Sequence, residues 1–243
     1  MNCLIIAAGH GSRLRDLSPS KPLTPVAGVA LIEHVISAAA VGGATRFTVV
    51  TGHEAARVEA FLEELAGRLD VAIETVRTAD WDLPNGHSVL SGAERIAGDY
   101  LLMMSDHLFE PAIVERLIAA GSGGVGVVLA VDRDLANPLL DMDDATKVET
   151  GEGGRILAIG KTLARFDAID TGIFLATPAL ADAIRAAITM GGAGSLSEGM
   201  QMLADEGQAM SFDIKGGRWL DVDDPAALAK AESMMAGSTG NAA

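Results

Sequence analysis

The first 130 residues alternate between short apolar runs and amphipathic stretches, and this alternation constrains the fold more than any other feature. The first run, residues 3–8, is wholly apolar and ends at Gly9, as expected for a buried parallel strand that opens into a loop. Alternating strands and helices form a mostly parallel sheet with right-handed crossover connections. We expect further strands at 46–51, 71–76, 100–104 and 125–131, and helices at 29–41, 54–69, 88–96 and 111–120.

After residue 131 the pattern changes to strand-like segments with short connections, which favour antiparallel pairing. We therefore expect a small antiparallel excursion from the parallel sheet, followed by a return of helices. No linker rich in Pro, Gly or Ser separates the two halves, so we predict a single domain. The expected strands are 145–149, 155–159 and 168–175, and the expected helices are 178–188, 196–205 and 225–235. The domain covers residues 1–236, with parts at about 1–130 and 131–236, and a flexible tail covers 237–243.

Charge and hydropathy exclude several functional classes. Eighteen Lys and Arg residues against 33 Asp and Glu residues give a formal net charge of −15, which disfavours non-specific binding to nucleic acid or anionic membranes. The mean hydropathy is +0.30, but no apolar stretch reaches the ~18 residues that a membrane-spanning helix needs. The single cysteine cannot form an internal disulfide, and the N-terminus has neither a basic region nor a small-residue cleavage site. We expect a cytoplasmic protein with no nucleic-acid or membrane partner.

The segment after the first apolar run is rich in glycine and is followed by two cations. It reads Ala8-Gly9-His10-Gly11-Ser12-Arg13, and Lys21 follows. A glycine-rich turn after a buried strand allows backbone N–H groups to approach a phosphate closely, and Arg13 and Lys21 supply positive charge there. Two common phosphate-binding motifs do not fit. The dinucleotide fingerprint needs a third glycine where Leu14 stands, and the nucleotide P-loop needs a glycine where Ser20 stands.

The segment resembles the signature loop of the nucleotidyltransferases that make activated sugars and polyol phosphates. In that family a strand is followed by G-x-G-[ST]-R-[LM] and then by [ST]-K-P-[LM]. The order Lys-Pro differs from the Pro-Lys of the isoprenoid-pathway cytidylyltransferases. The resemblance implies a three-layer, Rossmann-like (GT-A-like) α/β fold with a mostly parallel mixed sheet. The chain matches at Gly9, Gly11, Ser12, Arg13, Leu14, Ser20, Lys21, Pro22 and Leu23.

Later motifs narrow the resemblance to the inositol-1-phosphate cytidylyltransferases, and it spans almost the whole chain. Asn85-Gly86-His87-Ser88 stands where sugar uridylyl- and thymidylyltransferases have Gly-x-Ala, and it resembles the cytidylyltransferases of choline phosphate and inositol phosphate. In the inositol family the domain is often fused to a membrane-embedded phosphotransferase. This sequence has no such segment, so we expect the downstream step to lie elsewhere. The other shared motifs are 145–148, 159–161, 170–174 and 219–223.

The resemblance implies that a substrate phosphate attacks the α-phosphorus of CTP and releases pyrophosphate. A phosphate monoester has a second pKa of about 6, so it needs no general base at neutral pH. Catalysis then rests on positioning and on charge neutralisation, with Arg13 at the β- and γ-phosphates and Lys21 at the α-phosphate. Asn85 and Gly86 would contact the base, whereas Ser88 would either bind the nucleotide or only cap its helix. The implied nucleotide-binding residues are Ala8, Gly9, Gly11, Ser12, Arg13, Lys21, Asn85, Gly86 and Ser88.

Asp106 ends an apolar strand, which is the expected position of a metal ligand in an open α/β sheet. Oxygen ligands suit Mg²⁺, which takes one or two carboxylates and completes its shell with phosphates and waters. We expect Asp106, together with Arg13 and Lys21, to be catalytic. Asp221 is the expected second ligand and Asp223 is its rival.

The resemblance places Lys161 at the phosphate of the acceptor. The competing interpretation is an ordinary surface lysine between two strands. The expected partners are CTP and a small phosphorylated acceptor such as inositol 1-phosphate, and a homodimer is left open. The implied acceptor-binding residues are Lys147, Lys161, Asp170, Thr171 and Gly172.

Three other functions stay open. Cytidylylation of choline phosphate or a phosphonate is one, although choline sites use aromatic cages and the chain has only two Trp, one Tyr and six Phe residues. Uridylylation or thymidylylation of a hexose 1-phosphate is disfavoured by the segment 85–88. A catalytically silent nucleotide-sensing module is disfavoured because Arg13, Lys21, Asp106 and Asp221 are all present.

Overall fold

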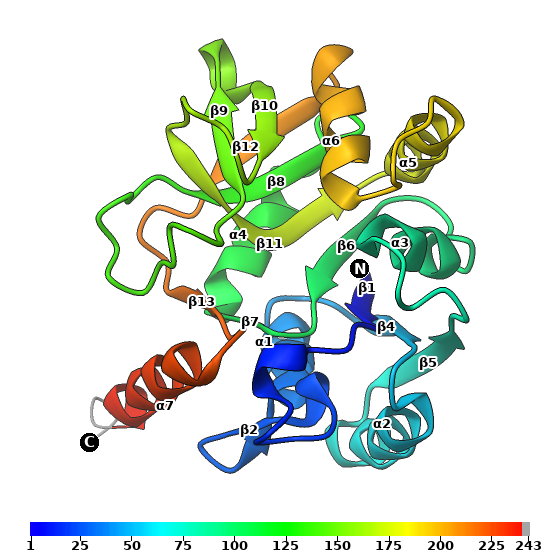
Figure 1. The fold of residues 1–243 in the computed structure, drawn as a ribbon, viewed down its shortest axis with the longest axis vertical. Coiled ribbons are helices and arrows are strands. Elements are labelled where there is room, and N and C mark those ends of the chain that lie inside the picture. The colour runs from blue at the N-terminus through cyan, green and yellow to red at the C-terminus, as the bar shows by residue number, and fades with distance from the viewer. Residues whose placement is uncertain (240–243) are drawn as a thin grey trace.

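The computed structural model describes residues 1–239, and residues 240–243 lie outside the description. A mixed sheet of nine strands runs through the molecule (Figure 1). Seven strands follow one another in the order β10-β9-β11-β6-β1-β4-β5, β8 pairs with β11, and β12 pairs with β8. The strands are β1 (Asn2–Ala7), β4 (Arg46–Thr51), β5 (Ala72–Arg77), β6 (Tyr100–Met104), β8 (Val127–Asp132), β9 (Lys147–Thr150), β10 (Ile156–Gly160), β11 (Ala168–Ala176) and β12 (Ala209–Asp213).

Helices cover both faces of this sheet. The covering helices are α1 (Leu31–Val41), α2 (Ala55–Leu69), α3 (Asn85–Ala93), α4 (Pro111–Ala120), α5 (Pro178–Thr189) and α6 (Leu196–Asp205), and α7 (Pro225–Thr239) packs outside the main sheet. Side chains of α1, α2 and α4 pack in one core cluster, and side chains of α3, α5 and α6 pack in a second. Strand β1 contributes Cys3 and Ile5 to the first cluster and Leu4 and Ile6 to the second. A strand buried on both faces needs apolar residues at every position, which explains its uninterrupted apolar run.

The order of the parallel strands creates a topological switch point beside β1. From β1 the chain continues to β4 and β5 on one side, and β6 then pairs with β1 on the other side. In open α/β sheets ligands bind in the crevice at the carboxyl ends of the strands where the order reverses. The glycine-rich segment follows β1, and Asp106 follows β6, so both lie at this crevice.

The second half of the chain adds antiparallel pairing. Strand β11 runs antiparallel to β6, β8 and β9, and β9 runs antiparallel to β10. Strand β12 pairs parallel with β8. The structure thus confirms the expected mixed sheet with an antiparallel excursion, although β12 was not predicted.

Two small ribbons lie outside the main sheet. Strands β2 (Pro25–Val26) and β3 (Val29–Ala30) form a hairpin, and β7 (His107–Phe109) pairs antiparallel with β13 (Trp219–Asp221). The hairpin explains why α1 begins at Leu31 and not at residue 29. None of these four short strands was predicted, because two or three residues cannot show a hydrophobic period.

Helix α7 extends away from the sheet in Figure 1 and packs on the ribbon of β7 and β13. It runs to Thr239, so residues 237–239 of the expected tail are helical, and the rest of that tail lies outside the described residues. Within residues 1–239, no helix combines the length and apolar character needed to cross a membrane. The division of one domain at about residue 130 stays a prediction.

Candidate active site

A cavity of about 840 Å³ opens at the carboxyl ends of β1 and β6. Its wall is formed by the glycine-rich segment, by the connection between β8 and β9, by the connection between β13 and α7, and by the start of β11. Among the residues that the structure describes, most predicted site residues line this cavity, whereas Gly86, Lys147 and Thr171 do not. The predicted residues that line it are Ala8, Gly9, Gly11, Ser12, Arg13, Lys21, Asn85, Ser88, Asp106, Lys161, Asp170, Gly172, Asp221 and Asp223.

The glycine-rich segment is shaped by the packing of Lys21. Gly11 has a φ of +60°, and a Cβ at this position would lie 2.3 Å from the Cβ of Lys21. A side chain would therefore be strained by the backbone conformation and would also collide with the lysine. The second glycine of the motif thus has a structural reason, which is to let Lys21 pass beneath the loop into the cavity.

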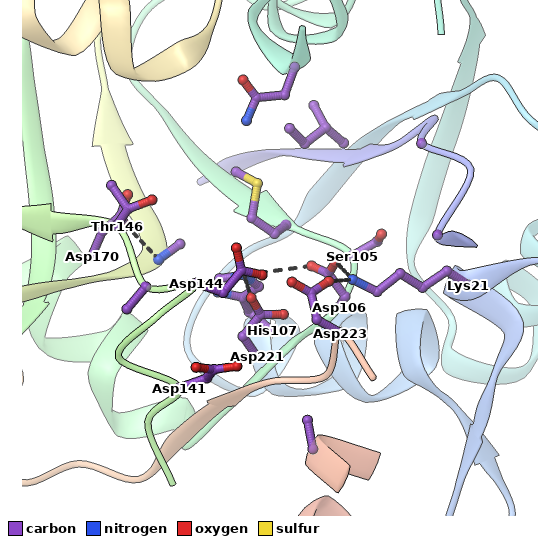
Figure 2. Close-up of a pocket in the computed structure, with 18 of the residues that line it drawn as sticks. Lys21, Ser105, Asp106, His107, Asp141, Asp144, Thr146, Asp170, Asp221 and Asp223 are labelled. Atoms are coloured by element: carbon purple, nitrogen blue, oxygen red, sulfur yellow. Dashed lines mark hydrogen bonds and ion pairs between the residues drawn. The ribbon is translucent and has the colours of Figure 1, made fainter. Parts of the chain in front are cut away.

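Lys21 is the most enclosed cation of the site. Its side chain is only 9% exposed, and its ammonium group pairs with the carboxylates of Asp106 and Asp223 (Figure 2). Burial disfavours the charged form, but the surrounding carboxylates outweigh it and hold the pKa of Lys21 above its usual value. The lysine is therefore charged in the folded protein at any pH near neutral.

The ribbon of β7 and β13 brings a second carboxylate beside Asp106. Asp221 is the cross-strand partner of His107, and the backbone N–H of Val222 donates to the carbonyl of Asp106 at 3.0 Å. His107 Nε2 lies 3.5 Å from Asp221 Oδ2 and 3.7 Å from Asp106 Oδ1. Asp106, His107 and Asp221 each offer one ligand atom, and these three atoms lie within 4.8 Å of one another.

His107 lines the cavity and is held in place by Trp219 and by the backbone of β11. Its ring stacks on Trp219 with a centroid distance of 6.0 Å, and Nδ1 is 2.8 Å from the carbonyl of Thr171. Burial works against the charged imidazolium, but the negative charge of Asp221 dominates and raises the pKa of His107 to about 10. Sequence reasoning missed His107, although its place directly after Asp106 was a usable signal.

The acidic cluster fits a hard divalent cation. Asp221 Oδ1 is buried and has no hydrogen-bond partner among the described residues, so it is free to act as a ligand. Asp223 is instead occupied by Lys21 and by Arg13, whose Nη2 lies 2.7 Å from its Oδ2. Carboxylate oxygens are the ligands that Mg²⁺ prefers in proteins. The residues at hand therefore suit a metal ion at Asp106 and Asp221, with His107 beside it.

Two further cations, Arg13 and Lys161, meet at Asp144. Arg13 Nη2 donates to Asp144 Oδ2 at 2.7 Å, and the Lys161 ammonium group donates to Asp144 Oδ1. These hydrogen bonds, that of Lys161 foremost, lower the pKa of Asp144 to about 2. Lys147 does not line the cavity, but its ammonium group donates to the carbonyl of Lys161 at 2.9 Å and so holds that residue in place. Asp144 was also missed, since no motif marks it.

The start of β11 forms the floor beside His107. Gly172 has a φ of +73°, and a Cβ there would lie 2.3 Å from His107 Nδ1. The buried Thr171 hydroxyl donates to the carbonyl of Ala130 at 2.8 Å, so Thr171 positions the backbone and does not face the cavity. Asp170 Oδ1 accepts from the N–H of Gly172, and burial raises the pKa of Asp170 to about 6.

The segment 85–88 has packing partners of its own. Helix α3 begins at Asn85, so the expected start at Ser88 is wrong and Ser88 is not a helix cap. Asn85 Oδ1 accepts from the N–H of Leu196 at 2.9 Å, at the first residue of α6. A Cβ on Gly86 would lie 2.3 Å from the carbonyl oxygen of Gly194, so Gly86 permits close contact with the loop before α6. Ser88 is buried and lines the cavity.

The site as a whole is a set of opposite charges that neutralise one another. Lys21, Arg13 and Lys161 face carboxylates from three separate parts of the chain. Cations on one wall and an acidic cluster beside them are suited to a phosphate-rich ligand that brings a divalent metal ion.

Comparison with known proteins agrees with this geometry. A bifunctional IPC transferase and DIPP synthase from Rubrobacter xylanophilus is 32% identical over 240 residues, and one from Aquifex aeolicus is 31% identical over 235 residues. Each alignment covers 96% of this chain and 51% of the relative, so the chain spans about half the length of these curated relatives.

A solved structure has the same fold. The inositol-1-phosphate CTP transferase from T. maritima superposes with a TM-score of 0.86 at 24% sequence identity, covering 100% of this chain and 97% of that chain. The family model of the MobA-like NTP transferase domain matches residues 3–202, which include the glycine-rich segment, Lys21 and Asp106. On this match, the chain belongs to the MobA-like NTP transferase domain family.

Proposed function

We propose that this protein is a cytidylyltransferase that transfers CMP from CTP to a small phosphate, with release of pyrophosphate. The acceptor is inositol 1-phosphate or a similar polyol phosphate. The observation that carries the proposal is the position of Lys21, buried between Asp106 and Asp223 at the switch point of the sheet. A cation held there, next to a glycine-rich turn, meets the phosphate at which charge develops during transfer. The names of the relatives support a CTP-dependent reaction on inositol phosphate.

Magnesium is the proposed metal. Asp106 and Asp221 would hold it through their oxygens, and His107 Nε2 lies 3.7 Å and 3.5 Å from these two carboxylates. When bound, Mg²⁺ neutralises phosphate charge and fixes the phosphate oxygens for in-line transfer. Asp223 is the weaker candidate because Lys21 and Arg13 are both within hydrogen-bond distance of its oxygens, whereas Asp106 Oδ1 has only a 3.7 Å contact with His107.

The chain's own groups divide the remaining work. Arg13 would bind the outer phosphates of CTP, and Lys21 would stabilise the charge that grows at the α-phosphate. Lys161, steadied by Lys147, would bind the acceptor phosphate. That phosphate is largely dianionic at neutral pH, so the site needs no general base. Asp170 therefore has no proton to remove in this reaction, although its pKa is raised.

The nucleobase would be recognised at the start of α3. Because Leu196 already donates to Asn85 Oδ1, the amide nitrogen of Asn85 is left as a donor to the base. Gly86 would act indirectly, by letting α3 pack closely against the loop before α6. A cytoplasmic location and a homodimer stay predictions from the sequence.

A pyrophosphate-release screen tests the proposal. The purified protein with Mg²⁺ is offered CTP, UTP, dTTP, ATP and GTP against a panel of phosphorylated polyols, sugars, choline and phosphonates. We expect turnover with CTP and a polyol phosphate, because a site that pairs with cytosine leaves buried polar groups unmatched with uracil. Equal turnover of UTP or dTTP with a hexose 1-phosphate would instead establish the sugar nucleotidyltransferase alternative. No turnover with any pair would favour the nucleotide-sensing alternative.

Asp106→Ala tests the metal site in the same assay. We expect activity to fall at least ~100-fold, which corresponds to about 2.7 kcal/mol of transition-state stabilisation. EDTA should silence the wild-type protein. Asp182→Ala is the matched control, because Asp182 is 77% exposed on α5 and does not line the cavity. Retention of more than a tenth of the activity in Asp106→Ala would contradict its role as a metal ligand.

A further inference from the structure

One carboxylate links cations from the two halves of the chain. Asp144 accepts from Arg13 through one oxygen and from Lys161 through the other. Arg13 follows β1, whereas Lys161 follows β10 on the antiparallel side of the sheet. In the proposed function these two cations bind different substrates, Arg13 the triphosphate and Lys161 the acceptor phosphate. Asp144 therefore occupies both substrate sub-sites at once.

The contacts of Asp144 are open to solvent. The side chains of Arg13, Asp144 and Lys161 are 49%, 29% and 57% exposed, against 9% for Lys21. Exposed ion pairs contribute little stability, and a phosphate offers the same cations more negative charge and more acceptor oxygens than a carboxylate does. A phosphate ligand is thus able to displace Asp144, whereas the pairs of Lys21 are enclosed.

The segment that carries Asp144 lies outside the strands of the main sheet, so a change in the partners of Asp144 breaks no strand pairing. Residues 133–146, here called the strap, connect β8 to β9 and contain turns but no strand or helix in the described structure. At its first end the strap is anchored to Asp132, which accepts from the side chain of Asn137 at 3.1 Å. Across its middle, the Lys230 ammonium group donates to the carbonyl of Pro138 at 3.1 Å. Figure 2 shows Asp144 of the strap beside His107 and Asp221, Asp141 near Asp221, and Thr146 beside Asp170.

We propose that Asp144 is an internal substitute for substrate phosphate, which pairs Arg13 with Lys161 until a phosphate ligand displaces it and thereby couples the two sub-sites. The inference rests on the proposed function for the identity of the two ligands. A ligand that takes Arg13, which also pairs with Asp223, leaves the carboxylate of Asp144 paired with Lys161 alone, so Lys161 is released more easily. Such coupling is reciprocal, and each phosphate ligand strengthens the binding of the other. Asp144 is a positioning residue and takes no part in the chemical step.

Asp144→Asn tests the inference because it removes the charge and keeps the shape. The matched control is Asp143→Asn, which removes the same charge from the exposed neighbouring residue. Calorimetry in EDTA measures the Kd of tripolyphosphate and of inorganic phosphate for the full chain. We expect Asp144→Asn to bind tripolyphosphate about tenfold more tightly than wild type, and Asp143→Asn to change the Kd less than about twofold. Unchanged or weaker binding in Asp144→Asn overturns the proposal, because an organising carboxylate would weaken anion binding when lost.

The coupling is measured by repeating the tripolyphosphate titration with saturating inorganic phosphate. In wild type, we expect phosphate to lower the Kd of tripolyphosphate at least about threefold, and in Asp144→Asn we expect no such change. Coupling that persists in Asp144→Asn overturns the proposal. Asp144→Glu keeps the charge and should restore the wild-type Kd and coupling, and thermal melts by circular dichroism check that all variants fold.

These probes have no nucleobase and no polyol, so their result does not depend on the substrate screen. If the screen finds a different nucleotide, the displacement of Asp144 by tripolyphosphate still stands. If CTP is turned over but Asp144→Asn binds anions as wild type does, only this inference fails. In the active enzyme Asp144→Asn should lower the KM for CTP more than it changes kcat.

Discussion

Lys21 and Lys161 carry the same ammonium group in opposite environments. Lys21 is 9% exposed and pairs with carboxylates that follow β6 and β13, both of which are fixed by strand pairing. Lys161 is 57% exposed and pairs with Asp144 on the strap. The first cation belongs to a preorganised centre, and the second belongs to a contact that exchanges partners. The difference suits a site that performs one chemical step on ligands that must enter and leave.

The sheet accounts for this difference. The parallel strands β1 and β6 end side by side, and their carboxyl ends present Lys21 and Asp106 to the same crevice. On the antiparallel side, the segment that precedes β9 contains no strand or helix, and Asp144 lies in it. A buried cation needs counter-charges that cannot move away, because an unpaired charge in a dry site is strongly unfavourable. An exposed cation has water as an alternative partner.

Lys21→Met gives the largest expected effect on this comparison. It leaves Asp106, Asp221 and Asp223 close together without their buried cation, so the carboxylates repel one another. We expect kcat to fall at least ~100-fold and the free energy of unfolding at pH 7 to fall by about 3 kcal/mol. Pyrophosphate release and urea unfolding measure the two quantities. If Lys21→Met unfolds at the same urea concentration as wild type, Lys21 does not stabilise the cluster of carboxylates around it. Its contribution to stability would then be no larger than that of the exposed Lys161.

Asp170→Asn tests whether the buried carboxylate of Asp170, on β11 of the antiparallel side, lowers the free energy of unfolding. The pKa of Asp170 is raised to about 6 by burial, above its value in the unfolded chain, so the folded protein loses stability as pH rises from about 4 to about 6. Asparagine keeps the acceptor oxygen for the N–H of Gly172. At pH 7 we expect the variant to be more stable by about 2 kcal/mol, within the ~3 kcal/mol that such a shift allows.

Urea unfolding between pH 4.5 and pH 7.5, in EDTA, measures this effect. The difference in unfolding free energy between Asp170→Asn and wild type should grow with pH and level off above about pH 7. Asp167→Asn is the comparison variant, because Asp167 lies directly before β11. Hydrogen bonds lower the pKa of Asp167 despite some burial, so removal of its carboxylate should reduce the free energy of unfolding. A difference that stays constant with pH would show that Asp170 does not titrate in this range.

Lys161→Met gives the smallest expected effect and probes the exposed side of the comparison. We expect the KM for the acceptor phosphate to rise about tenfold, or 1.4 kcal/mol. The KM for CTP should change less than about threefold, and the free energy of unfolding should change by less than about 0.5 kcal/mol. Steady-state kinetics with each substrate varied in turn separates the two constants. Loss of CTP affinity with the acceptor affinity retained would reverse the assignment of the two sub-sites.

The sequence predicted those parts of the site that a local pattern specifies. Residues 9–23 form one motif, and it directly follows the apolar run of β1. Asp106 likewise follows the apolar run of β6. Both Lys21 and Asp106 line the cavity at the carboxyl ends of these strands. Asp221 was predicted from the family pattern, and its pairing with His107 depends on a ribbon of only three residues in each strand. Such short strands are stabilised by tertiary contacts and leave no period in the sequence.

Asp144 and Asn85 show two further limits of sequence reasoning. Asp144 lies in an irregular segment with three other aspartates nearby, and only the folded chain selects the one that meets Arg13 and Lys161. A polar residue at the start of a helix can bind a ligand or satisfy a neighbouring helix end. Asn85 does the second through its Oδ1, which accepts from the first residue of α6 more than a hundred residues away, and it also lines the cavity.

The pairing of β7 with β13 also has a consequence for the order in which the protein matures. Ribosomes release the chain from its N-terminus, so Asp221 and Asp223 emerge after every strand of the main sheet. The strands that position Lys21 and Asp106 are therefore synthesised before the cross-strand partner of His107. The cluster of Lys21, His107 and their carboxylates is therefore complete only when β13 has paired with β7.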